Sequence, residues 1–201
     1  MPLLHAPILE QAGFSLGSSN IVKNYIYKLD GSNKYINFSD PLLLTSDCEI
    51  SLDVILGINN TTQVIYGGGS SPERFYIGTE NGNWLVGNGT DRVDTMSPAD
   101  IGVINKTVLS LSGGVFKLAV NSVVVYEQTI KYSTAKDLDG ISTLSGFRLL
   151  GSSFNFTLSK NGAVTNSITL TNKAQGATQL PTVGSVSATI VGYNENDWEE
   201  V

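Results

Sequence analysis

The sequence VLSLSGGVFKLAVNSVVVY, residues Val108–Tyr126, decides the fold class of this chain. Apolar side chains alternate with small or polar ones on both sides of a Gly113-Gly114 turn, and an Asn121-Ser122 turn follows. Alternation with a period of two, interrupted by glycine and asparagine turns, predicts antiparallel strands with one buried and one exposed face. Because the rest of the chain repeats this pattern, we expect an all-β protein.

Outward from this stretch, short apolar runs separated by turns predict many further strands, which is typical of a sandwich or barrel. The clearest example is Cys48–Leu56, where apolar and polar residues alternate along the whole segment. An Asn81-Gly82 pair predicts a hairpin between strands at 74–77 and 84–86. The polar stretch 88–101 predicts a loop, with a short helix beginning at Ser97-Pro98.

The composition is that of one domain with few charges. A chain of 201 residues with 41% hydrophobic residues is long and apolar enough to form one core. Charged residues make up 15% of the chain, against about 25% in a typical domain. The neutral polar surface that this predicts suits packing against other copies, binding of neutral sugars or a purely structural role.

Several classes of partner are excluded by composition. The formal net charge is −6 and no basic stripe is present, so we expect no nucleic acid partner. No run of about 20 apolar residues occurs, so we expect no membrane insertion. The single cysteine, Cys48, lies in an apolar strand pattern, and we expect it to be a buried, unreactive thiol.

The ends of the chain differ from its middle. The N-terminal sequence MPLLHAPILEQAG lacks the basic start and long apolar stretch of a signal peptide. Pro2 and Pro7 oppose a long helix there, so we expect residues 1–19 to form an extended arm. We expect the sandwich domain to cover residues 20–193 and an acidic tail to cover residues 194–201.

Three segments resemble a known family of domains. Lys34–Leu56 reads KYINFSDPLLLTSDCEISLDVIL, Lys106–Glu127 contains the hairpin described above, and Phe147–Gly151 reads FRLLG. These segments resemble successive strands of concanavalin A-like and laminin-G-like domains, over roughly Tyr25–Thr171. The resemblance implies an antiparallel jelly-roll β-sandwich. Its motifs consist mostly of apolar spacing, so they specify a fold rather than an activity.

The end of the chain resembles structural proteins of tailed bacteriophages. The resemblance lies in Phe154–Gly176, in the tryptophan-containing end Asn194–Trp198, and in the short N-terminal arm. It implies a non-enzymatic virion protein, either a head decoration or a tail and receptor-binding module, assembled in the host cytoplasm. Its partners would be other virion proteins, further copies of the chain and a host surface glycan, and Trp198 would make a subunit contact. A lectin-like module of non-virion origin is the alternative.

The same fold also hosts glycoside hydrolases, which makes glycan hydrolysis a third and less favoured alternative. Retaining hydrolases need two carboxyl groups about 5–5.5 Å apart, and this family places its acids on one strand as Glu-x-Asp-x-x-Glu. The nearest match pairs Glu49 with Asp53, but Ser51 replaces the middle acid and a hydrophobic residue replaces the last. We therefore expect solvent-facing carboxylates and no enzyme.

A saccharide site is the main candidate for binding chemistry. Sugars stack an apolar ring face on an aromatic side chain and hydrogen-bond to surrounding amides and charged groups. The candidate set, bordered by Arg74 and Tyr76, is Asn81, Asn83, Trp84, Asn88 and Arg92. The alternative is that Trp84 belongs to the core and that the asparagines only form turns.

Calcium is a weaker candidate, and we expect no other cofactor. Calcium takes oxygen ligands, and Asp137 and Asp139 lie close together in the sequence KDLDG, as do Asp91 and Asp94 in TDRVD. The alternative is that these aspartates cap backbone amides in ordinary turns.

Overall fold

The structure is a computed structural model that describes residues 24–58, 60–68, 71–132, 136–144 and 146–201. The expected N-terminal arm, residues 1–19, lies outside the described residues. Within these ranges the chain forms strands and two short 3₁₀ helices, η1 (Lys173–Gln175) and η2 (Glu195–Asp197). None of the described segments forms a helix long and apolar enough to cross a membrane.

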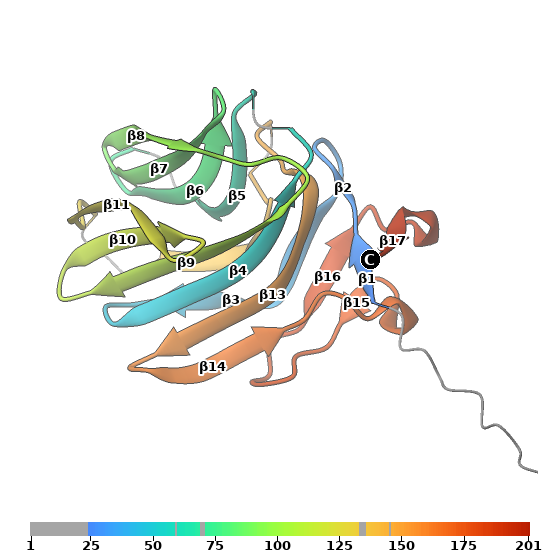
Figure 1. The fold of residues 1–201 in the computed structure, drawn as a ribbon. Coiled ribbons are helices and arrows are strands. Elements are labelled where there is room, and N and C mark those ends of the chain that lie inside the picture. The colour runs from blue at the N-terminus through green and yellow to red at the C-terminus, as the bar shows by residue number, and fades with distance from the viewer. Residues whose placement is uncertain (1–23, 59, 69–70, 133–135, 145) are drawn as a thin grey trace, which may run out of the picture.

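The described strands form two large antiparallel sheets and a small third one (Figure 1). The seven-stranded sheet has the order β11 (Val123–Thr129), β10 (Val115–Val120), β9 (Ile104–Ser112), β4 (Cys48–Leu56), β13 (Leu150–Lys160) and β14 (Ala163–Ile168), with β2 (Leu29–Asp30) paired beside β13. The eight-stranded sheet has the order β15 (Thr178–Gln179), β16 (Ala188–Val191), β3 (Tyr35–Leu44), β12 (Lys136–Ile141), β5 (Gln63–Gly68), β6 (Arg74–Glu80), β7 (Asn83–Gly89) and β8 (Asp91–Pro98). The third sheet pairs β1 (Tyr25–Tyr27) with β17 (Trp198–Glu200).

The main core lies between the two large sheets. In β4, Ile50, Leu52 and Val54 are buried while the residues between them are half-buried or exposed, as the alternation predicts. Phe38 of β3 meets Phe156 of β13 with ring centroids 4.9 Å apart, which joins the two layers. The predicted all-β, antiparallel sandwich is therefore confirmed, and Cys48 is buried in its core as expected.

The predicted hairpin turns are also confirmed. Asn121 and Ser122, between β10 and β11, have φ angles of 50° and 69°. Asn81 and Gly82, between β6 and β7, have φ angles of 51° and 85°. Two consecutive residues with positive φ form the tight turn whose twist matches paired strands, and asparagine and glycine tolerate this conformation best.

The prediction of a loop with a short helix at 88–101 is wrong. Residues Asp91–Pro98 form β8, which pairs with β7 at one end of the eight-stranded sheet. An edge strand has a partner on one side only, so it can carry polar residues on both faces and can end in a proline. The apolar alternation that identifies a central strand is absent for this reason.

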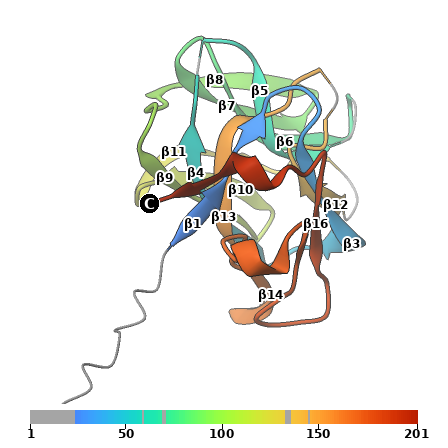
Figure 2. The ribbon, with the colours of Figure 1, turned by 90° about the vertical axis from the view of Figure 1, so that its right-hand side faces the viewer.

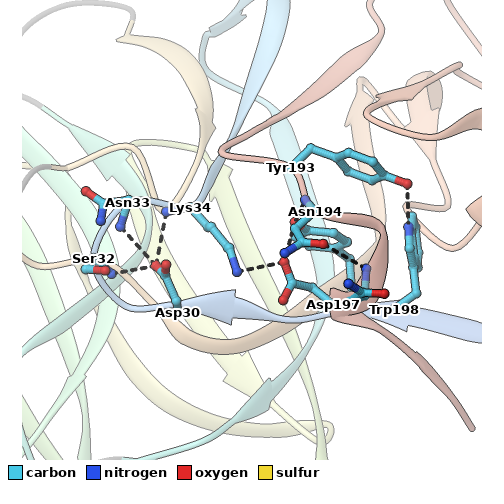
Figure 3. Close-up of polar contacts among 10 residues, drawn as sticks. Asp30, Ser32, Asn33, Lys34, Tyr193, Asn194, Asp197 and Trp198 are labelled. Atoms are coloured by element: carbon cyan, nitrogen blue, oxygen red, sulfur yellow. Dashed lines mark hydrogen bonds and ion pairs between the residues drawn. The ribbon is translucent and has the colours of Figure 1, made fainter.

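The C-terminal segment closes the fold against β1, at the end of the molecule away from β7 and β8 (Figures 1 and 2). The Tyr27 ring stacks on Tyr193 with centroids 5.6 Å apart and meets Trp198 edge-on at 5.2 Å. Burial is the largest cause that raises the pKa of Tyr27 to about 12, so its phenol stays protonated and donates to Asp197 at 3.0 Å. Lys34 forms an ion pair with Asp197 at 2.7 Å (Figure 3).

The expected acidic tail is consequently part of the folded body. Residues 194–201 form η2 and β17, and the indole of Trp198 donates to the Tyr193 hydroxyl at 3.2 Å. Trp198 is 8% exposed because it packs within its own chain. A contact of Trp198 with another subunit stays a prediction.

Asp30 holds the turn between β2 and β3. Its carboxylate accepts hydrogen bonds from the backbone N–H groups of Ser32, Asn33 and Lys34, at 2.9 to 3.1 Å (Figure 3). Burial acts to raise the pKa of Asp30, but these donors outweigh it and lower the pKa to about 2. The ionised carboxylate therefore stabilises the turn.

Replacement of Asp30 by asparagine should reduce the acid sensitivity of folding. A pKa lowered to about 2 in the folded state contributes stability that is present above the unfolded pKa of about 4 and is lost as the pH falls toward 2. Between pH 7 and about pH 2.5, urea unfolding should show the parent losing about 1 kcal/mol more than Asp30→Asn, allowing for solvent screening. Equal losses in the two proteins would contradict this role.

Candidate functional site

A pocket of about 190 Å³ opens on the outer face of the eight-stranded sheet, over β5, β6 and β8. This face points away from the main core. The lining combines two arginines, two aromatic residues, two aliphatic residues, one threonine and one serine: Arg74, Arg92, Tyr76, Phe147, Val64, Leu144, Thr62 and Ser71. The pocket therefore offers ring faces and hydrogen-bond donors side by side.

The strand register explains the space at this pocket. Tyr76 in β6 lies opposite Gly67 in β5 and Gly87 in β7, and Gly87 lies opposite Arg92 in β8. A Cβ atom on Gly87 would overlap the Tyr76 ring. Tyr76 can lie flat across β7, next to Arg92, because Gly87 has no side chain.

A small second core forms the floor of the pocket. Val64, Tyr76 and Leu85 are buried together, and Leu144 packs against them. The loop that carries Leu144 is tied to β5, because the backbone N–H of Val64 donates to the carbonyl of Phe147. Phe147 itself is 44% exposed, so it presents an accessible aromatic side chain at the pocket.

Three polar side chains of the pocket, Arg74, Arg92 and Thr62, are held in place by hydrogen bonds. Arg92 forms an ion pair with Glu80, and the Thr62 hydroxyl donates to the same carboxylate. The Nη2 group of Arg92 also donates to Thr62 at 3.2 Å. Arg74 donates through Nε to the Gly89 carbonyl at 3.1 Å and through Nη2 to the Thr90 carbonyl at 3.2 Å.

The structure brings part of the predicted saccharide set to this pocket. Arg92 lines it, together with Arg74 and Tyr76, which were predicted to border the site. Asn81 lies exposed in the β6–β7 turn, and Asn83 donates to Asp94 at 3.2 Å. Neither asparagine lines the pocket.

Trp84 and Asn88 face the opposite side of the sheet. Trp84 is 1% exposed and belongs to the main core. This confirms the alternative that Trp84 is a core residue. Asn88 is fully buried, where its amide donates to the Thr129 carbonyl and accepts from the Lys131 N–H. Asn88 thereby fixes the end of β11 to β7 and takes no part in the pocket.

Sequence reasoning missed Phe147 and Thr62 as site residues. Phe147 is distant along the chain from the predicted set, and Thr62 precedes β5 in a polar stretch that carries no sign of a binding site. The one signal for Phe147 was an aromatic residue at the start of a predicted strand, where the structure instead has a loop.

The aspartates considered for calcium have other surroundings. Asp137 and Asp139 lie exposed in β12, and a calcium site there stays a prediction. Lys131 beside Asp91 lowers the pKa of that carboxyl, and Asp94 accepts from the Met96 N–H. Within the described ranges, no three His, Cys, Asp or Glu residues are grouped as metal ligands would be.

The acids considered for hydrolysis are also separated. Glu49 and Asp53 share the outer face of β4, as predicted, and accept from Ser110 and Asn155. Because Glu49 and Asp53 are four residues apart in one strand, their backbone positions are separated by about 13 Å. This separation exceeds the spacing of about 5–5.5 Å between the two carboxyl groups of retaining hydrolases. The two carboxyl groups therefore do not form a pair of that kind.

Of the comparisons with known proteins, the one with solved structures bears on the fold. No protein-family model matches the sequence, and no curated protein is significantly similar to it. Among solved structures, the LG1–3 region of the laminin α2 chain matches with a TM-score of 0.53 and 12% identity over 85% of this chain. This chain spans only 30% of that structure. The similarity shows a laminin-G-like jelly-roll sandwich, as the sequence resemblance implied.

Replacement of Gly87 by alanine should disrupt the pocket floor. The added methyl group overlaps the Tyr76 ring, so the ring must move, and we expect a loss of about 1–3 kcal/mol in unfolding free energy. Gly68→Ala in β5 is the control, because a Cβ there meets no atom within 4 Å. Urea unfolding that gives the same stability for both variants would exclude the proposed contact.

Proposed function

We propose that this chain is a non-enzymatic, lectin-like module that binds a saccharide in the pocket over β5, β6 and β8. The observation that supports this proposal best is the position of exposed Phe147 beside the fixed guanidinium of Arg92. A sugar presents an apolar ring face and a rim of hydroxyl groups, and these two side chains match those features.

The absence of enzymatic activity is part of the proposal. Hydrolysis of a glycan needs a general acid together with a base or nucleophile. No carboxylate or imidazole is present among the described residues that line this pocket. Its donors and rings favour binding over proton transfer.

Replacement of Phe147 by alanine should weaken saccharide binding without unfolding the protein. Because Phe147 holds the loop through its backbone carbonyl, the variant keeps that hydrogen bond and loses only the ring. An aromatic contact of about 1 kcal/mol predicts an affinity loss of about fivefold to tenfold, measured by calorimetry with a glycan selected on an array. Val164→Ala, which removes another exposed apolar side chain from β14, should bind like the parent. Equal affinity of parent and Phe147→Ala would refute this site.

A second candidate function is supported by a different surface. Two apolar grooves flank β1 and share Ile26 and Ile55. Four large hydrophobic side chains that line them are at least 38% exposed: Ile101, Ile104, Leu150 and Val201. Exposed apolar surface of this kind suits contact with another protein. We propose that it joins copies of this chain within a tailed-phage virion, where the chain would be a head or tail component beside other virion proteins.

This assembly role predicts a homo-oligomer in solution. Ile104→Glu places a charge in the apolar surface and should convert the oligomer to monomers in light scattering, because a desolvated unpaired carboxylate opposes association. Val123→Glu, at an exposed valine on β11, should leave the oligomer intact. A parent that is monomeric at high concentration would contradict the proposal.

A further inference from the structure

The two arginines of the pocket differ in how their charges are compensated. Arg92 is paired with the Glu80 carboxylate, so this pair is neutral. Arg74 has only the carbonyl oxygens of Gly89 and Thr90 as hydrogen-bond acceptors. Among the described residues, no carboxylate lies within ion-pair distance of Arg74.

The nearby acid on β8 is already paired. The positive charge of Arg74 contributes to lowering the pKa of Asp91, but Asp91 forms its ion pair with Lys131. The bonds to Gly89 and Thr90 use Nε and Nη2, so the N–H groups of Nη1 have no acceptor among the described residues. Arg74 thus brings to the pocket an oriented cation with free donors.

The surroundings strengthen the interaction of Arg74 with an anion. Arg74 is half-buried, and Val64, Leu144 and Phe147 provide apolar lining in the same pocket. A charge partly removed from water gains more from a direct partner than an exposed one does. A guanidinium held by neutral acceptors matches a carboxylate in both charge and geometry.

We propose that the pocket selects saccharides that carry a carboxylate, such as hexuronic acids, with the carboxylate on Arg74 and the sugar ring on Phe147. This inference rests on the proposed saccharide-binding function and adds the class of ligand to it. Arg92, whose charge is neutralised by Glu80, donates hydrogen bonds to the hydroxyl groups of either an acidic or a neutral sugar.

The experiment compares two oligosaccharides of equal length, one ending in glucuronate and one ending in glucose, by calorimetry on the full chain. The parent should bind the glucuronate ligand about tenfold more tightly, which corresponds to one good charged hydrogen bond. Arg74→Gln should remove this preference, so that the two ligands bind the variant with equal affinity. Lys117→Gln makes the same change in net charge on β10, outside the pocket, and should keep the preference.

Two further measurements keep the inference testable if Arg74→Gln folds poorly. Raising the salt from about 0.05 M to 0.5 M should weaken glucuronate binding by the parent but leave glucose binding unchanged. Glu80→Gln frees the charge of Arg92 and should increase the affinity for glucuronate.

The outcomes separate the two proposals. If the parent binds both ligands equally, or if Arg74→Gln keeps the preference for glucuronate, the carboxylate assignment is overturned while the saccharide site stands. If the parent binds neither these two ligands nor any glycan on an array, the proposed function fails, and the ligand class fails with it.

Discussion

The structure depends on the alternation of side chains between the two faces of each strand. In β6, this rule sends Phe75 and Ile77 into the main core and Tyr76 to the outer face. A shift of one residue in register would exchange these faces along the whole strand. The sandwich and the pocket are therefore set by the same register.

Small residues on the neighbouring strands turn this alternation into a pocket. Gly67 and Gly87 flank Tyr76, so its ring can lie across the sheet where side chains would otherwise stand. The outer face then buries a second, smaller apolar cluster under the loop that carries Leu144 and Phe147. This cluster lowers the polarity around Arg74 and Arg92, and a hydrogen bond is stronger in less polar surroundings than in water.

The fold was largely predictable from sequence because its signals are local. Strands such as Cys48–Leu56 alternate cleanly, and the turns at 81–82 and 121–122 each begin with an asparagine, which tolerates positive φ. The edge strand β8 was missed because a strand with one partner needs no apolar face. The packing of residues 194–201 against the fold could not be predicted either, because β17 pairs with β1, which lies far away along the chain.

The site was less predictable, for a physical reason visible in β7. Trp84-Leu85-Val86 is apolar throughout because both faces of the strand are buried there, so the sequence pattern carries no sign of which side chain points outward. Trp84 is the obvious sugar-binding residue by type, yet it faces the core. Arg74, Tyr76 and Arg92 were found because they are close in sequence, whereas Phe147 comes from a distant loop.

The most direct test is to map ligand contacts by NMR on the uniformly labelled chain, with the glucuronate-terminated oligosaccharide as titrant. The account predicts that the largest shift changes occur at the outer face of β5, β6 and β8 and in the loop at Phe147, where the pocket residues gather. Changes concentrated around Glu49 and Asp53 on β4, or around Asp137 and Asp139 on β12, would contradict it.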